Sequence, residues 1–391
     1  MSLDRRTVLA AVASAGLPAQ ALAARKPAKL RCKGHVAYAG APLRAPLADW
    51  QLEAAAKAGS VRLAPAIDDG LEEKLSAAAG KMKIQALTAA VARPDGGIWT
   101  QTLTGPLHDA PFPQRFFWAS VGKAYTATAI LQMVEEGKLS LDDKLSRWAP
   151  DMPNAAFITV EDLLGHTSGL YSFQEDPGLH AERGYKPPER LLAVAAARPP
   201  LFCPGGAWSY SNTGYVLLGR IIEAVDGKPY DRALTGRIIE RLDLRETTIL
   251  APRETPRDMA YPASEDDDVT TPYAAGAVSA SSADVVRFWR ALMASRLHGV
   301  ELTRRRFARL YPMVNVSPAS SYGLGVMVSD LKLADPSATD TWLGHAGGMP
   351  GARAMVAYAL EKQAFVAVAL TGEGSPEATA NLLLSSLPKK A

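Results

Sequence analysis

Several features common in enzymes are missing from this chain. Its 391 residues contain only two cysteines, Cys32 and Cys203, and no Cys-x-x-Cys or His-Glu-x-x-His spacing, so the common zinc sites are absent. No Gly-x-Ser-x-Gly occurs, which excludes the serine turn of the α/β-hydrolases. A glycine-rich phosphate loop is also missing. The sequence therefore gives no support to a metal centre, an α/β-hydrolase elbow or a phosphate-binding loop.

The chain also lacks strong charge and long apolar segments. Its formal net charge is +3, part of which belongs to the N-terminal residues, so no nucleic-acid-binding field is expected. After residue 23, no segment approaches the run of about 20 apolar residues that crosses a membrane as a helix. We therefore expect a mature chain that has no transmembrane anchor and no nucleic-acid partner.

Residues 1–23 have the pattern of an export signal. Arg5-Arg6 precedes an apolar run, and Ala21-Leu22-Ala23 has the small-x-small form of a cleavage site. The arginine pair resembles a twin-arginine signal, and an ordinary secretion signal is the alternative. Both predict a periplasmic or secreted protein. In an oxidising compartment Cys32 and Cys203 can pair, but their positions in the sequence leave this pairing open.

The rest of the chain predicts an α+β fold. Strand-like runs occur early and late, and helical patterns dominate between them, so we expect an antiparallel sheet built from both chain ends and flanked by helices. A mostly helical second lobe would interrupt it. The expected parts are an N-terminal arm (24–63) and a main domain (64–388), the latter with an α/β lobe (about 64–120 and 313–388) and a helical lobe (about 121–312).

Ser120 is the first candidate for chemistry. It lies where an extended segment enters a helix that continues to Val134, and Lys123 follows one turn later on the same face. A serine needs a neighbouring base to become a nucleophile, and a buried lysine can lose enough pKa to act as one. The alternative is a helix-capping serine with a solvated lysine. The same spacing recurs at residues 329–332 and 386–389, but without a following apolar helix.

Tyr210 and Asn212 form a second candidate pair. They alternate in a loop that enters a helix, so both side chains can face the same side. A lysine ammonium nearby would favour the ionised phenol, which would let Tyr210 act as a base. Asn212 has a donor and an acceptor with which to orient Lys123 and a substrate carbonyl. Turn chemistry with a buried tyrosine is the alternative.

The stretch from Gly344 to Gly351 is the third candidate. Gly347 and Gly348 would let a substrate approach the backbone closely, and a backbone N–H here can point into an oxyanion hole. His345 lies in the same stretch and is a candidate for substrate binding. A structural histidine in a tight turn is the alternative.

In this order, the three stretches resemble the motifs of the serine β-lactamase and penicillin-binding-protein superfamily. The likeness is greatest to the class C branch, which includes D,D-peptidases, D-aminopeptidases and family VIII esterases. The resemblance implies a β-lactamase-like fold, Ser120 as nucleophile, and proton transfer shared by Lys123 and Tyr210, with the base left open. It also implies an oxyanion hole from the N–H groups of Ser120 and Gly348, and an acyl-enzyme that needs no cofactor.

One departure from the family pattern bears on the substrate. His345 and Ala346 replace the lysine and hydroxyl residue that help β-lactamases hold a carboxylate. This favours an esterase or D-amino-acid peptidase or amidase over two alternatives, a D,D-carboxypeptidase or weak β-lactamase and a penicillin-binding sensor without turnover. The expected partner is a small ester, amide or peptide, with Arg353 as the next candidate for carboxylate binding. His166 is interpreted as a structural histidine that fixes a loop. The oligomeric state stays open.

Overall fold

The computed structural model describes residues 30–65, 70–105, 113–262, 268–332 and 339–387. The expected export signal, residues 1–23, lies outside this part of the chain. Within the described residues, no helix is both long enough and apolar enough to cross a membrane.

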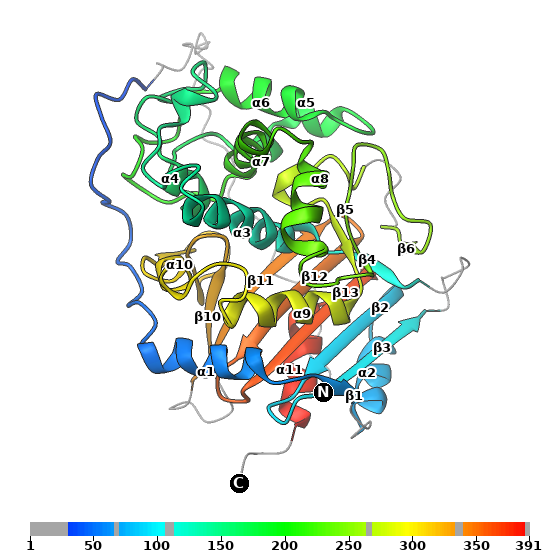
Figure 1. Cartoon of the computed structure of the whole chain (residues 1–391). Helices are drawn as coiled ribbons and strands as arrows, with labels where there is room; N and C mark the ends of the chain where they lie inside the picture. Colours follow the sequence, from blue (N-terminus) through cyan, green and yellow to red (C-terminus); the bar gives the residue numbers. More distant parts are fainter. Residues whose placement is uncertain (1–29, 66–69, 106–112, 263–267, 333–338, 388–391) are drawn as a thin grey trace, which may run out of the picture.

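A nine-stranded sheet forms one side of the molecule (Figure 1). The strand order is β1-β3-β2-β13-β12-β11-β10-β9-β8. The early strand β2 pairs with the late strand β13 in antiparallel register, which confirms the expected sheet built from both chain ends. The strands are β1 (Ala64–Pro65), β2 (Lys83–Ala92), β3 (Gly97–Thr104), β8 (Tyr311–Pro312), β9 (Ser320–Tyr322), β10 (Met327–Lys332), β11 (Thr339–Met349), β12 (Ala352–Ala359) and β13 (Ala364–Glu373).

Helices cover both faces of this sheet (Figure 1). One face packs against α9 (Ser282–Met293) and α1 (Asp49–Ser60), and the other packs against α2 (Leu71–Ala79) and α11 (Pro376–Ser386). β13 reflects this arrangement because its residues alternate between faces. Ala367 and Ala369 belong to the core on the α9 side, whereas Val366, Val368 and Leu370 belong to the core on the α11 side.

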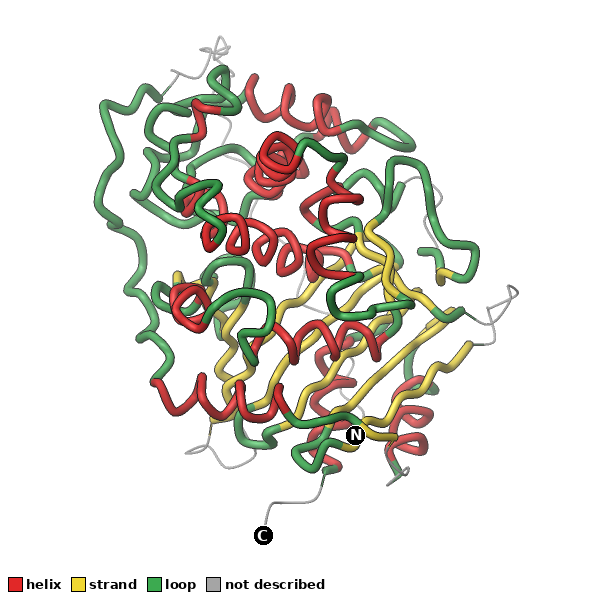
Figure 2. The backbone as a smooth tube through the Cα atoms, viewed as in Figure 1, coloured by secondary structure: helices red, strands yellow, loops and turns green. Residues whose placement is uncertain are grey.

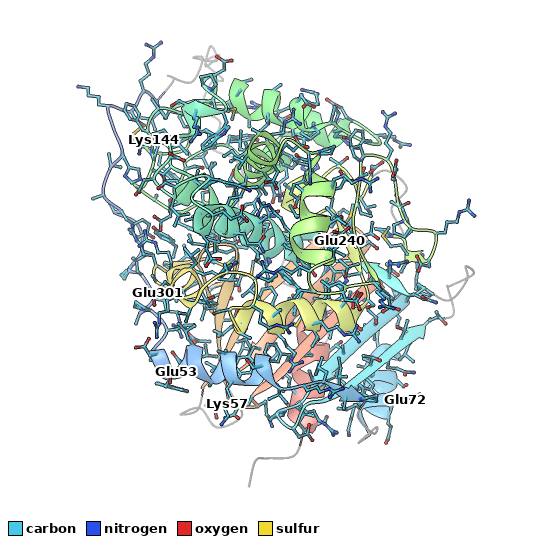
Figure 3. The ribbon with its side chains drawn as sticks, viewed as in Figure 1. Glu53, Lys57, Glu72, Lys144, Glu240 and Glu301 are labelled. Carbon is cyan, nitrogen blue, oxygen red and sulfur yellow. A yellow bond between two sulfur atoms is a disulfide. The ribbon has the colours of Figure 1, made fainter. Side chains whose placement is uncertain are left out.

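Helix α1 was not expected from the sequence, which predicted only an arm over residues 24–63. Its buried residues are Ala55 and Gly59. A Cβ on Gly59 would lie 2.5 Å from the carbonyl oxygen of Arg290 in α9, so only a glycine allows this close approach. Glu53 and Lys57 of the same helix are exposed (Figure 3). The helix is thus defined by contact with a distant segment, and its own pattern is weak.

The second lobe is mostly helical, as expected, and contains a small sheet with the strand order β5-β7-β4-β6 (Figure 2). At its centre, α3 is buried continuously from Gly122 to Met133, which is typical of a helix surrounded by protein. The elements are β4 (Arg115–Phe117), β5 (Thr247–Ile249), β6 (Met259–Ala260), β7 (Val278–Ala280), α3 (Gly122–Glu135), α4 (Val160–Gly165), α5 (Pro177–Ala181), α6 (Pro188–Ala197), α7 (Asn212–Asp226), α8 (Tyr230–Leu234) and α10 (Val300–Arg306).

Residues 30–48 run along the outside of the molecule from the helical lobe to the sheet (Figure 1). Cys32 and Cys203 form a disulfide, which resolves the pairing that the sequence left open. Beyond it, the N–H of Val36 donates to the Pro204 carbonyl at 2.9 Å, and the N–H of Ala39 donates to the Gly206 carbonyl at 2.9 Å. The arm is therefore tied to the segment that leads into Tyr210.

Candidate active site

Ser120 lies in a single 3-10 turn, Ala119–Val121, between β4 and the first residue of α3. The turn is packed tightly by backbone from two other segments. A Cβ on Gly347 of β11 would lie 2.6 Å from the Ser120 nitrogen, and one on Gly276 would lie 2.8 Å from the Ala119 carbonyl carbon. Both positions need glycine, because any side chain there would displace the serine turn.

Lys123 is fully buried, and its Nζ lies 3.1 Å from Ser120 Oγ, as the sequence predicted for this pair. The same nitrogen donates to the carbonyl of Ala275 at 2.6 Å. Burial holds the pKa of Lys123 well below its ordinary value, because a charged amine is poorly solvated in the protein interior. The neutral amine has a lone pair, and it lies within reach of the serine proton.

Tyr210 completes the group around Ser120. Lys123 Nζ lies 5.0 Å from the centre of the Tyr210 ring and 5.3 Å from that of Tyr215 on α7. Burial raises the pKa of Tyr210, and its hydrogen bond with the Ser120 side chain opposes this only in part. Burial thus acts against the phenolate that was expected beside the lysine. Lys123 is itself driven toward the neutral form, and burial dominates both groups.

Asn212 begins α7, where its N–H donates to Ser172 Oγ at 3.1 Å. Its side-chain Oδ1 is buried and has no hydrogen-bond partner among the described residues, so it does not accept from Lys123. Asn212 lines the same cavity as Ser120. An unpaired buried amide oxygen at this place is suited to accept a hydrogen bond from a ligand.

His345 has a different place from the one expected. Its ring is buried, with Nε2 3.0 Å from the Tyr322 hydroxyl and Nδ1 2.6 Å from the Ala346 carbonyl. Burial, with a smaller effect of Lys123, lowers the pKa of His345 to about 3. It lines neither cavity at Ser120. Both ring nitrogens contact protein groups in this structure, and substrate contact by His345 stays a prediction.

Two cavities meet at Ser120. The narrow one has a volume of about 260 Å³ and the wide one about 1270 Å³. Ser120, Tyr210, Gly348, Met349 and Pro350 line both of them. A substrate bound across the serine can thus place one part on each side of its reacting carbonyl.

The sequence pointed to these two cavities only in part. Gly347 and Gly348 were expected at a turn before a strand, but they lie within β11, where Gly348 faces Arg353 of β12 in register. Arg353 lines the wide cavity, and Lys186 lines the narrow one. Within the described residues, no cluster of three or more His, Cys, Asp or Glu side chains suits a metal ion.

Three contributors around Ser120 were not assigned roles from the sequence. These are the Ala275 carbonyl that holds Lys123, the ring of Tyr215 beside it, and the Tyr322 hydroxyl that holds His345. The spacing of Tyr215 three residues after Asn212 on one helix was the available signal for that residue. The other two come from distant segments and had no local signal.

Comparison with known proteins identifies the family. The sequence profile of the Beta-lactamase family matches residues 71–386. The chain belongs to the beta-lactamase family. Its relatives belong to the superfamily of serine β-lactamases and penicillin-binding proteins, so the predicted membership and α+β fold are confirmed.

Relatives within this superfamily have several different names. Penicillin-binding protein 4 of Amycolatopsis lactamdurans is 33% identical over 189 residues, which are 44% of this chain and 49% of that protein. Esterase EstB of Burkholderia gladioli is 33% identical over 148 residues, which are 34% of this chain and 37% of that protein. The chain thus spans about half the length of these relatives or less.

A solved structure gives a longer match. The D-stereospecific amidohydrolase from a Streptomyces species has a TM-score of 0.69 and 28% identity, and the match covers 83% of this chain and 100% of that one. The β-lactamase-like fold therefore extends over most of this chain.

Proposed function

We propose that this protein is an exported serine hydrolase that acts through an acyl-enzyme on Ser120, with a small ester or D-amino-acid amide as substrate. One observation carries the proposal: a buried lysine nitrogen lies 3.1 Å from Ser120 Oγ at the junction of two cavities. In this proposal, residues 64–388 form the hydrolase domain, and residues 1–23 are the export signal removed from it.

Lys123 is the base in the proposed mechanism. Its lowered pKa favours the neutral amine, and the raised pKa of Tyr210 favours the neutral phenol. Lys123 Nζ takes the proton of Ser120 Oγ as this oxygen forms a bond to the substrate carbonyl carbon. Tyr210 then passes its proton to the leaving group as the bond to it breaks, and it regains a proton from the Lys123 ammonium, which restores the neutral phenol and amine. Water hydrolyses the acyl-enzyme by the reverse proton path.

The oxyanion is proposed to form between the backbone N–H groups of Ser120 and Gly348. Ser120 precedes the 14-residue helix α3, whose N-terminal dipole favours developing negative charge. Gly348 lines both cavities, and its neighbour Gly347 brings β11 against the serine turn. Asn212 Oδ1, which lacks a protein partner, is suited to accept an N–H of a bound amide.

The preference for esters or D-amino-acid amides rests on what lines the cavities. Where the β-lactamases have a lysine and a hydroxyl residue that bind a carboxylate, this chain has His345 and Ala346. His345 is buried, and Ala346 has no hydroxyl. The names of the relatives, an esterase and a D-stereospecific amidohydrolase, agree with this class. The penicillin-binding relative keeps a second candidate open, a D,D-carboxypeptidase, weak β-lactamase or sensor that is acylated without turnover.

A fluorophosphonate probe and a panel of three substrates test this proposal. The probe should label the wild type at Ser120, and p-nitrophenyl butyrate or D-alanine p-nitroanilide should be turned over faster than nitrocefin. Ser120→Ala should lose turnover by at least about 10³-fold while keeping its unfolding temperature. Labelling at another serine, or full activity of the variant, would refute Ser120 as the nucleophile. A single stoichiometric burst without steady turnover would identify a sensor.

A further inference from the structure

His166 holds the backbone on both sides of Tyr210. The N–H of Ser211 donates to His166 Nδ1 at 3.1 Å, and the N–H of Ser209 donates to the His166 carbonyl at 3.0 Å. The imidazole ring lies beside the phenol ring, with 4.3 Å between their centres. His166 therefore contacts the backbone of Ser209 and of Ser211 and the ring of Tyr210 between them.

The backbone of His166 has an unusual conformation. It caps the C-terminus of α4 in the left-handed region, with φ 62° and ψ 33°. This conformation is costly for most side chains and is tolerated best by glycine and asparagine. It turns the chain so that the carbonyl and the ring of His166 both reach N–H groups of the segment that carries Tyr210.

The loop that carries His166 is itself firmly held. Asp162 of α4 accepts hydrogen bonds from the N–H and hydroxyl of Thr159 at 2.9 and 2.7 Å and from the hydroxyl of Thr167 at 2.7 Å. His35 of the N-terminal arm adds a contact at 3.2 Å from its Nε2 to Asp162. The N–H of Gly205 donates to the Thr167 carbonyl at 2.9 Å. His166 is thus attached to a rigid support, as a residue that positions another must be.

We propose that His166 is a positioning residue, which sets the place of the Tyr210 hydroxyl for proton transfer at Ser120 by binding the N–H groups of Ser209 and Ser211. This inference rests on the proposed function, because it assigns Tyr210 a role in the proton path.

The hydrogen-bond pattern determines which tautomer of His166 is present. Because Nδ1 accepts from Ser211, the ring proton is on Nε2. Nε2 is buried and has no hydrogen-bond partner among the described residues. His166 therefore has no path through which to exchange a proton with Ser120 or Lys123, and its effect on the reaction passes through the geometry of Tyr210.

A double-mutant cycle with Tyr210 tests this inference. His166→Gly tolerates the left-handed backbone but removes the acceptor and the ring, and we expect kcat to fall about 10- to 100-fold with little change in KM. In a Tyr210→Phe background the same change should cost almost nothing more, because the hydroxyl that it positions is already gone. His166→Asn keeps an acceptor near the place of Nδ1 and the backbone tolerance, so it should restore most of the lost kcat.

The outcome of the cycle shows whether His166 acts through the position of Tyr210. Additive effects of His166→Gly and Tyr210→Phe would mean that His166 acts on the fold in general, and an Asn variant as impaired as the Gly variant would exclude the hydrogen bond to Ser211. Thermal unfolding monitors the fold of every variant. If His166→Gly does not unfold cooperatively, the cycle is run with His166→Ala, and failure of both to fold would also overturn the inference. Loss of fluorophosphonate labelling in the wild type would instead refute the proposed function itself.

Discussion

The two walls that meet at Ser120 are built in different ways. On the sheet side, the serine turn is held by close backbone contact with Gly347 of β11, where a Cβ would lie 2.6 Å from two backbone atoms. On the helical side, the residues on either side of Tyr210 donate hydrogen bonds to His166, and the disulfide of Cys203 ties the preceding loop to the N-terminal arm.

This difference teaches which changes each wall tolerates. Close backbone packing is sensitive to added volume, because even one methyl group would clash with neighbouring backbone atoms. A wall held by hydrogen bonds and a covalent link is sensitive to the loss of donors, acceptors or the link. We therefore expect an added methyl group to disrupt the sheet side. On the helical side, we expect disruption from the loss of a hydrogen-bonding group or of the disulfide.

The largest effect is expected from an addition to the sheet wall. Gly347→Ala would place a methyl group 2.6 Å from the Ser120 nitrogen and the Trp118 carbonyl oxygen. We expect at least about a 100-fold loss of kcat/KM, because a small displacement of the nucleophile has that cost, and a loss of about 1–3 kcal/mol in the free energy of unfolding.

Gly348→Ala is the matched control for stability in this experiment. Its Cβ would meet only the Ala352 carbonyl oxygen at 3.5 Å and Arg353 Cγ at 3.6 Å, which are ordinary contacts. Its unfolding temperature should therefore stay near that of the wild type. Equal stability and activity of Gly347→Ala and the wild type would show that the close approach of β11 is not needed.

The second effect concerns the link on the helical wall. Replacing both Cys32 and Cys203 by serine should lower the free energy of unfolding by about 2–4 kcal/mol, because the disulfide restrains the unfolded chain. The kcat should fall as well, since Cys203 begins the segment that leads to Tyr210. Urea unfolding and steady-state kinetics would be measured with and without reductant. The reductant should affect the wild type alone, and an unchanged midpoint in the double variant would contradict the link's role.

A third effect is a dependence of stability on acid, which appears only below neutral pH. The pKa of His345 is about 3 in the folded protein, against an ordinary value of 6.5, and burial is the main cause. As the pH falls below 6.5, the unfolded chain binds a proton that the folded chain refuses, so stability present above 6.5 is lost down to about 3. His298 shows the same lowering to about 3. Each group contributes a slope of about 1.4 kcal/mol per pH unit.

His345→Gln should make this acid loss shallower. The free energy of unfolding would be measured by urea titration at several pH values across the range from 6.5 to about 3. His298→Gln is the matched comparison, because it removes the other buried imidazole away from Ser120. Parallel curves for the wild type and the His345 variant would mean that His345 does not titrate in this way.

The smallest effect distinguishes the two cavities. Arg353 is exposed, has no hydrogen-bond or ion-pair partner among the described residues, and lies opposite Gly348 in the sheet. Arg353→Gln should lower kcat/KM for nitrocefin relative to p-nitrophenyl butyrate by about 10-fold, the value of one charge-assisted hydrogen bond. Lys186→Gln should leave this ratio unchanged, since the Lys186 ammonium already donates to the Gly184 carbonyl at 2.9 Å. The opposite pattern would place carboxylate binding in the narrow cavity.

Much of the molecule was predictable from local patterns. Alternating strands near both ends and helical patterns between them were sufficient for the α+β fold, because sheet and helix periodicities are properties of short segments. The helix that follows Ser120 and the pair with Lys123 were predictable for the same reason. The order of three motifs was sufficient for the family, although each motif alone was weak.

Other features were decided only by the tertiary structure. The sequence suggested a phenolate for Tyr210 and a histidine close to its ordinary pKa at His345, but both groups are buried among segments far away in the chain, and burial raises the pKa of Tyr210 and lowers that of His345. The pairing of Cys32 with Cys203 and the close approach of Gly347 to Ser120 likewise join distant segments. The type of a residue and its spacing from others determine which chemistry is available to it. Its solvation and its neighbours, which determine the protonation state and the space around it, exist only once the chain has folded.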